Sequence, residues 1–252
     1  MSSLLLAAFA IYGTTLAVVL FVKKSALKKA NLFLGILLIS FCVFLLQRAI
    51  LETNTISIPI WLQFVMGGLW YSIPPLIFLH ALYVLYPSRK FKKWDLLHTL
   101  PVVLHVVNTI PFFIFLGETE QGEWIAQGKS REDILYVLMT NGYVLLLQFL
   151  IYMPWSFIII KEFLKTNQSR LDKENTNRIK LLRKGYIVLS TFIFLMESFR
   201  MFHIQGYWTQ LFFLGIIIVI FYLAFLAIYN PDVLFKRISF SKSFRSKTLP
   251  IK

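Results

Sequence analysis

The sequence predicts an all-α integral membrane protein, a seven-transmembrane-helix bundle with its N-terminus outside and its C-terminus in the cytoplasm. Three observations lead to this prediction: 58% of the 252 residues are hydrophobic, only 15% are charged, and the apolar residues gather in runs of about twenty. In soluble domains about a quarter of the residues are charged. A helix of about 20 apolar residues crosses the ~30 Å hydrocarbon core of a bilayer. Lipid is therefore the expected solvent for most of this chain.

The distribution of lysine and arginine predicts the orientation. The seven expected spans are 3–22, 32–51, 61–86, 96–116, 134–160, 186–204 and 208–229. Of the 26 basic residues, 22 lie in the segments that follow the first, third, fifth and seventh spans, whereas the segments on the other side hold two. Basic residues concentrate on the cytoplasmic side of a membrane protein. We therefore expect a membrane domain over 1–230 and a basic cytoplasmic tail or linker over 231–252, in a multi-pass protein of the cytoplasmic (inner) membrane.

Each span has features that support its assignment. No basic residue precedes the first span, which favours a retained helix over a cleaved signal peptide. The second ends near Arg48, whose long side chain can reach the outer headgroups. The third contains Pro74 and Pro75 at mid-depth, and proline kinks a helix because it has no N–H to donate. We expect a kink held by packing there, with a hinge as the alternative. Further prolines interrupt the fourth and fifth spans, and none occurs in the sixth or seventh.

A polar stretch, K-K-W-D-L-L-H-T-L-P at 92–101, leads into the fourth span. Trp94 suits the aromatic belt at the membrane interface. Asp95 is expected to cap the fourth helix by accepting a hydrogen bond from the amide near His98, where the helix dipole also favours a negative charge. His98 is expected to pair with Asp95 and to titrate near neutral pH. We interpret Trp94, Asp95 and His98 as a structural junction, with a proton-linked role as the alternative.

Five polar residues on four spans form a candidate ligand pocket. Ionisable groups inside a membrane usually face the bundle interior and mark function. Counted from the outer helix ends at ~1.5 Å per residue, the deeper ones lie roughly 10–12 Å inside. The candidate ligand-binding residues are Arg48, Asn108, Asn141, Glu197 and Arg200. Two structural interpretations stay open: Glu197 and Arg200, three residues apart, can pair with each other, and Arg48 can extend to the headgroups.

Several chemistries have no residues to support them. Cys42 is the single cysteine, so no disulfide can form within the chain. The four histidines lie at scattered depths, which predicts no metal site; they are His80, His98, His105 and His203. Phosphate-binding, dinucleotide-binding and serine-nucleophile motifs are absent, so we expect no cofactor and no enzymatic activity. The net charge of +14 follows from the topology, and no direct binding of nucleic acid is expected.

Short motifs along the chain carry a family resemblance. They are Pro74-Pro75 with the helix end A-L-Y-V-L-Y, the basic turn P-S-R-K-F-K-K, the segment W-D-L-L-H-T-L-P, the basic loop from Lys161 to Gly185 and Y-N-P-D-V-L-F. Together they resemble the N-terminal multi-helix membrane domain of Bacteroidetes AraC-type transcriptional regulators, in which a cytoplasmic helix-turn-helix domain follows. Pro74 stands where the family pattern has glycine. The sequence reaches Lys252 without a helix-turn-helix domain.

Topology, polar residues and resemblance together predict a sensor or receptor module. It would pass an outer-side or in-membrane signal to a cytoplasmic output, and the resemblance implies transcriptional regulation as that output. The expected partners are the lipid bilayer, a small-molecule or peptide ligand, and a cytoplasmic output domain or protein, with the oligomeric state left open. A small transporter or an accessory subunit of a membrane complex is the alternative.

Overall fold

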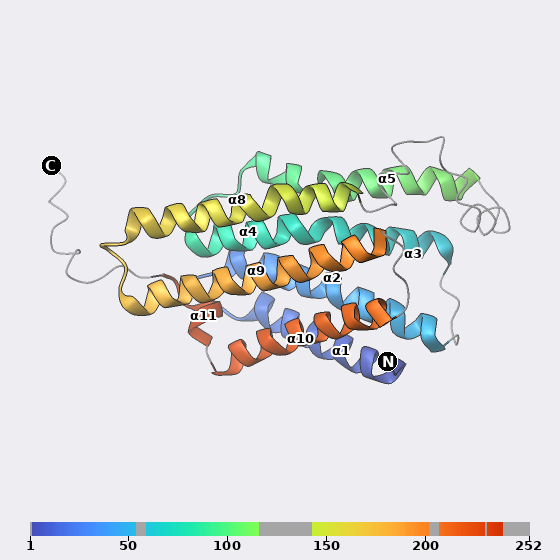
Figure 1. The fold of residues 1–252 in the computed structure, drawn as a ribbon, viewed down its shortest axis with the longest axis horizontal. Helices are drawn as coiled ribbons and strands as arrows, with labels where there is room; N and C mark the ends of the chain where they lie inside the picture. The colour runs from blue at the N-terminus through green and yellow to red at the C-terminus, as the bar shows by residue number, and fades with distance from the viewer. Residues whose placement is uncertain (1, 54–58, 116–142, 202–206, 230, 239–252) are drawn as a thin grey trace.

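The computed structural model is an elongated bundle whose helices run along one axis (Figure 1). It describes residues 2–53, 59–115, 143–201, 207–229 and 231–238, and the regular elements within these ranges are all helical. The elements are α1 Ser3–Val22, α2 Lys28–Thr53, α3 Ile60–Gly67, the 3₁₀ helix η1 Gly68–Ser72, α4 Ile73–Leu85, the 3₁₀ helix η2 Lys93–Thr99, α5 Leu100–Phe115, α8 Tyr143–Asn167, α9 Lys173–Met201, α10 Tyr207–Tyr229 and α11 Pro231–Phe235.

Five helical stretches are long and apolar enough to cross a bilayer. They are Ser3–Val22, Lys28–Thr53, Val65–Leu85, Tyr143–Asn167 and Gln210–Ile228. These stretches indicate a multi-pass membrane protein and confirm the all-helical class. The total of seven spans and the outside position of the N-terminus remain predictions.

The third predicted span is three elements in series. A turn of 3₁₀ helix, η1, separates α3 from α4, and Pro74 and Pro75 lie in the first turn of α4. The run from Val65 to Leu85 is nonetheless continuous, since Ser72 and Ile73 both keep right-handed helical dihedral angles. The 3₁₀ turn stands directly before the two prolines, and the expected kink remains a prediction. The alternative role of these prolines as a hinge is not tested by this arrangement.

Two helices extend into segments that the sequence analysis treated as loop or tail. α9 begins at Lys173, within the basic connection that precedes the sixth predicted span. Residues Pro231–Phe235, the start of the predicted tail, form the short helix α11. Both extensions lie outside the apolar runs, so hydropathy alone does not detect them.

Segments that follow alternate spans meet at one end of the bundle. Ser25, between α1 and α2, donates to the carbonyl of Phe235 at 2.9 Å. Lys29, at the start of α2, donates to the carbonyl of Arg89, beyond α4, at 2.5 Å. Figure 1 shows the turn between α8 and α9 at the same end as α11. The basic segments therefore share one end, called the basic end below.

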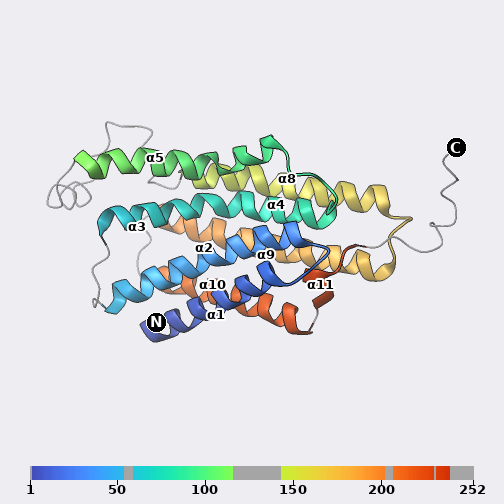
Figure 2. The ribbon, with the colours of Figure 1, turned by 180° about the vertical axis from the view of Figure 1, so that it is seen from behind.

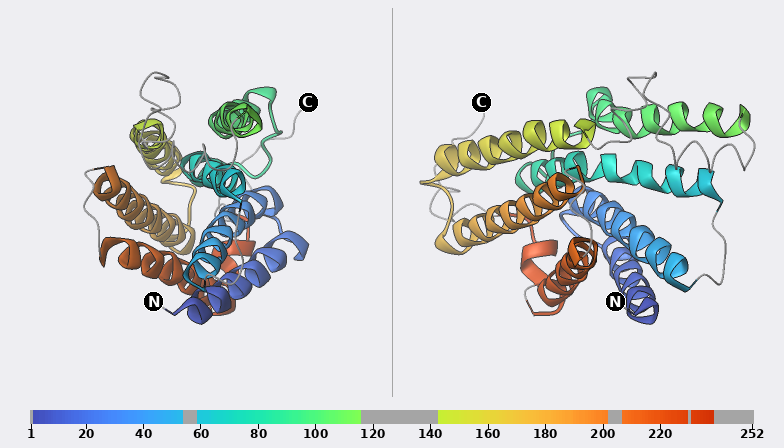
Figure 3. Two further views of the ribbon diagram at one scale, coloured as in Figure 1. Left: turned by 90° about the vertical axis from the view of Figure 1, so that its right-hand side faces the viewer. Right: turned by 45° about the vertical axis from the view of Figure 1, so that its right-hand side comes forward.

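Helices α1 and α2 run in opposite directions, whereas α4 and α8 both run toward the basic end. α1 packs along α2, α2 on α4, α4 on α8 and α8 on α9. Seen from behind, α1, α2 and α4 lie side by side (Figure 2). The view along the bundle places α5 and α8 on one side and α1 and α10 on the other (Figure 3). Gly13 lets α1 approach its neighbours closely, because a Cβ there would lie 2.6 Å from Cys42 Sγ and 3.1 Å from Ile220 Cδ1.

Candidate functional site

A cavity of about 390 Å³ lies between α2, α4, α9, α10 and α11. Most of its wall is apolar, with Leu34 from α2, Leu223 from α10 and Leu234 from α11 as examples. His80 lines it five residues before the end of α4, roughly 8 Å along the helix axis from that end. The cavity therefore occupies the half of the bundle nearest the basic end, and its volume falls in the range of small-molecule sites.

Two polar side chains meet in the cavity wall. The hydroxyl of Tyr186, on α9, lies 2.6 Å from Nδ1 of His80, on α4. The rings meet edge to face, with centroids 5.8 Å apart. Both side chains are buried, with His80 4% and Tyr186 9% exposed. A mostly apolar wall with a few polar groups is the usual composition of a site that binds a small apolar molecule.

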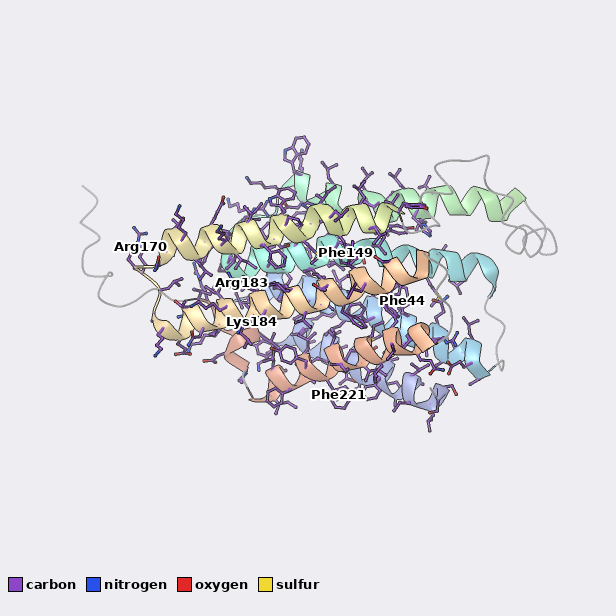
Figure 4. All side chains as sticks on the ribbon, in the orientation of Figure 1. Phe44, Phe149, Arg170, Arg183, Lys184 and Phe221 are labelled. Atoms are coloured by element: carbon purple, nitrogen blue, oxygen red, sulfur yellow. The ribbon has the colours of Figure 1, made fainter. Side chains whose placement is uncertain are left out.

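The cavity reaches the outer surface of the bundle between α9 and α10. Val188 and Ile218 line it from these two helices and are 69% and 58% exposed. Gly185 also lines it, and a Cβ added there would meet no heavy atom of neighbouring elements within 4 Å. Lys184 stands exposed at the rim; it is labelled on α9 in Figure 4, where Phe221 marks α10. The opening thus faces the surface that lipid would cover.

One arginine holds α11, called the exit helix below because it is the last described helix, against α9. The guanidinium of Arg178 donates to the carbonyls of Asp232 and Lys236, the latter at 2.7 Å, and to Oδ1 of Asn175 at 2.9 Å. These two carbonyls lie at the start and just beyond the end of α11. Burial lowers the pKa of Arg178 from its ordinary value, against the opposing effect of nearby carboxylates, of which Asp232 has the largest.

Two further segments contact the exit helix. Lys23, after α1, places its ammonium 3.9 Å from the ring centroid of Phe235, a cation–π contact. Arg237, just beyond α11, donates to Ser88 in the turn after α4 at 2.8 Å. With Ser25 and Arg178, these contacts join α11 to three separate parts of the bundle. The position of α11 therefore depends on how those parts are packed.

The junction after α4 contains a bidentate ion pair. Arg89 donates to both carboxylate oxygens of Asp95, at 2.7 and 2.9 Å, and Tyr83 donates to the same carboxylate at 3.0 Å. The backbone N–H of Lys92 donates to it at 2.9 Å. Burial alone would raise the pKa of the Asp95 carboxyl, but the hydrogen bonds from Arg89, Lys92 and Tyr83 lower it below its ordinary value. The same pair raises the pKa of Arg89.

These contacts correct the expected capping geometry. Asp95 accepts the amide of Lys92, before η2, and not the amide near His98, because it lies at the third position of the 3₁₀ turn. His98 does not pair with Asp95: its Nδ1 lies 2.7 Å from the hydroxyl of Tyr152, on α8. Trp94 is exposed beside this junction, and its place in the interfacial belt remains a prediction. These contacts join the turn after α4 to η2 and α8, and the proton-linked alternative remains a prediction.

The predicted outer pocket is described only in part. Arg48 donates to Glu52 at 3.0 Å, one turn along α2, and its guanidinium lies 6.0 Å from the ring centroid of Phe213. Asn141 lies outside the described residues, as do the side chains of Asn108, Glu197 and Arg200. Whether these groups converge therefore stays a prediction. The cavity lies in the opposite half of the bundle.

The residues that line the cavity were not predicted from the sequence. His80 was considered only as a metal ligand, and Tyr186 and Leu234 were not considered. One signal was available: Gly185 is a small residue at the point where a basic segment becomes apolar. Within the described residues, no group of three or more histidine, cysteine, aspartate or glutamate side chains is placed to hold a metal ion.

Comparisons with known proteins add no further assignment. No protein-family model, no curated protein and no solved structure matches this chain. The function therefore has to be argued from the cavity and from its connection to α11.

Proposed function

We propose that this chain is a sensor module of the cytoplasmic (inner) membrane, which passes an in-membrane signal to a cytoplasmic output that regulates transcription. The observation that carries the proposal is the position of Leu234. Its side chain lines the cavity, while Arg178 and Ser25 hold the backbone carbonyls around it in α11. A molecule in the cavity thus contacts α11, the helix that follows the last predicted span.

A ligand can act on this arrangement only through differential affinity. If α11 has two packings, a molecule that binds one of them more tightly shifts the population toward that packing. A tenfold preference corresponds to about 1.4 kcal/mol. Since α11 is held by hydrogen bonds from three segments, a shift of this size is comparable to the net contribution of one such bond, roughly 0.5–1.5 kcal/mol.

The charge distribution supports a cytoplasmic output. α11 lies at the basic end, and by the positive-inside rule that end belongs in the cytoplasm. Residues 239–252, which follow α11, carry four more basic side chains that suit an anionic membrane surface. In this proposal all seven predicted spans cross the membrane, with the N-terminus outside.

The coupling can be tested by placing a side chain in the cavity. In the variant Gly185→Phe the added ring has open space to enter, and it imitates an occupant. Nitroxide labels on Lys236→Cys, whose backbone carbonyl still accepts from Arg178, and on Lys165→Cys, on α8, report the position of α11 by pulsed electron resonance in proteoliposomes. Cys42 is buried, which protects it from the label.

Gly67→Phe is the matched control, because a Cβ at Gly67 also meets no neighbour within 4 Å and the residue lies far along the bundle from α11, before η1. We expect Gly185→Phe to shift the distribution of distances between the labels and Gly67→Phe to leave it unchanged. A folded Gly185→Phe variant with the distribution of the parent protein would refute the coupling between the cavity and α11.

A further inference from the structure

We infer that the cavity binds a neutral, lipid-soluble molecule through a carbonyl oxygen, which accepts a hydrogen bond from Nε2–H of His80. This inference deepens the proposed function and rests on it for the consequence of binding, although binding itself can be measured separately. Three observations carry it: the hydrogen bond between His80 and Tyr186, the charges in the cavity wall, and the side on which the cavity opens.

The hydrogen bond determines which nitrogen of His80 carries the proton. A tyrosine hydroxyl donates one hydrogen, and a neutral imidazole has one nitrogen that donates and one that accepts. Among the described residues, Nδ1 of His80 is the one acceptor within hydrogen-bond distance of the Tyr186 hydroxyl. We assign the donor role to Tyr186, because the reverse direction would leave both its hydroxyl hydrogen and Nε2 of His80 unpaired among the described residues. In this assignment the ring proton is on Nε2.

The Nε2–H donor has no partner among the described residues. In the described part of the chain, His80 makes no hydrogen bond besides the one to Tyr186, although its side chain is buried and lines the cavity. Nε2 of His80 is not among the fully buried polar atoms that lack a partner, so it keeps contact with open space while its side chain lines an apolar wall. A donor that faces an apolar space without an acceptor is unfavourable. A ligand with an oxygen acceptor would satisfy it, and Tyr186 would hold the ring in the orientation that presents this donor.

The charge of the wall selects a neutral acceptor over a carboxylate. Among the described residues that line the cavity, Lys184 is the one charged side chain; it is exposed to the surroundings, and no ion pair or hydrogen bond joins it to His80 or Tyr186. An anion held at His80 would lose its water without gaining a cation. A carbonyl oxygen accepts the hydrogen bond and carries no net charge, so it avoids this penalty.

The opening explains why the molecule should come from the lipid. Val188 and Ile218 are exposed where the cavity opens between α9 and α10, on an apolar surface. A solute dissolved in the hydrocarbon core can therefore enter without crossing the polar basic end. Quinones and long-chain ketones have the required chemistry, an apolar body with a neutral carbonyl group.

The test uses the purified full chain in detergent micelles and measures the dissociation constant from ligand-dependent thermal stabilisation. Three probes distinguish the classes of ligand: a benzoquinone with a ten-carbon tail, the ketone 2-tridecanone, and laurate as the anionic comparison. We expect the benzoquinone or the ketone to bind the wild-type chain at least tenfold more tightly than laurate. Binding by the benzoquinone alone would identify a quinone-type ligand. Laurate binding as tightly as both neutral probes would overturn the inference.

A double variant tests the assigned donor, and a cavity-filling variant with its control tests the site. Replacing both partners, His80→Phe with Tyr186→Phe, leaves neither member of this hydrogen-bonded pair without its partner and should weaken binding of the neutral probe roughly tenfold. Gly185→Phe should abolish binding, whereas the control Gly67→Phe should retain it. Unchanged affinity in the double variant would overturn the role of His80. If Gly185→Phe shifts α11 while no neutral probe binds the wild type, the inferred ligand class is wrong and the proposed sensor function stands. If a neutral probe binds tightly but Gly185→Phe does not shift α11, the ligand class stands and the proposed sensor function is wrong.

Discussion

Removal of the Asp95 carboxylate should destabilise the protein more than most single substitutions of a polar residue do. Asp95 is 3% exposed and accepts hydrogen bonds from Arg89, Lys92 and Tyr83. Breaking a buried ion pair on one side typically costs about 3–5 kcal/mol, because the remaining charge is left buried. Arg89 is 23% exposed and can turn toward water, which reduces that penalty. We therefore expect Asp95→Asn to lower the free energy of unfolding by about 2–3 kcal/mol.

A double-mutant cycle isolates the interaction between Asp95 and Arg89. The variants are Asp95→Asn, Arg89→Met and their combination, and unfolding is followed by far-ultraviolet circular dichroism in mixed detergent and dodecyl sulfate micelles. The expected coupling is about 2 kcal/mol, since two charge-assisted hydrogen bonds join the pair. The pair Arg48–Glu52 is the control, as a partly exposed pair one turn apart in a helix, with an expected coupling of about 0.3–0.5 kcal/mol. Equal coupling in the two cycles would refute the reasoning.

The same pair predicts how stability depends on pH. The pKa of Asp95 is lower in the folded protein than its ordinary value of about 3.9. The contribution of the carboxylate is therefore complete above that ordinary value and is lost as the pH falls through the lower, folded value. We expect the melting temperature of the wild type to drop more steeply below about pH 4 than that of Asp95→Asn. Parallel profiles for the two proteins would contradict the assignment.

Two further predictions concern packing and the cavity wall. Gly13→Ala should lower the free energy of unfolding by about 1–3 kcal/mol, because the new Cβ would overlap the buried Cys42 sulfur and force α1 away from α2. Unfolding in mixed micelles measures this change. A variant as stable as the wild type would contradict the close approach of α1 to α2. Tyr186→Phe should lower it by about 1–2 kcal/mol by leaving Nδ1 of His80 without a partner. Adding His80→Phe should then recover part of the loss, and a further loss of similar size would argue against the hydrogen bond.

Hydropathy predicted the ends of some helices closely and missed others for an identifiable reason. The first predicted span, 3–22, coincides with α1, and the seventh, 208–229, differs from α10 by one residue. Both are uninterrupted apolar runs bounded by polar segments. α9 begins well before its predicted span because its first turns are polar and leave the apolar region while remaining helical. Hydropathy measures where lipid can be the solvent, not where the backbone hydrogen bonds stop.

The capping prediction for Asp95 named the wrong amide: the carboxylate accepts the N–H of Lys92, at the start of η2, and it also gathers two side chains from earlier in the chain. Tyr83 lies twelve residues before it, and Arg89 six. The rule considers amides within the following turn, whereas the chain folds back after α4 and brings Arg89 and Tyr83 to the carboxylate. His98 also has a partner that is distant in the sequence, since the hydroxyl of Tyr152 is 54 residues away along the chain.

The sequence by itself determined the solvent of this protein, its helical class and the end at which the basic segments gather, because hydrophobic length and charge are properties of each segment alone. The tertiary structure decided which side chains meet: His80 with Tyr186, 106 residues apart, and Arg178 with the exit helix. The physical reason is that most membrane-crossing helices here are apolar on every face, so their periodicity does not specify rotation about the helix axis. Side-chain packing between neighbouring helices sets that rotation, and with it the cavity and its connection to α11.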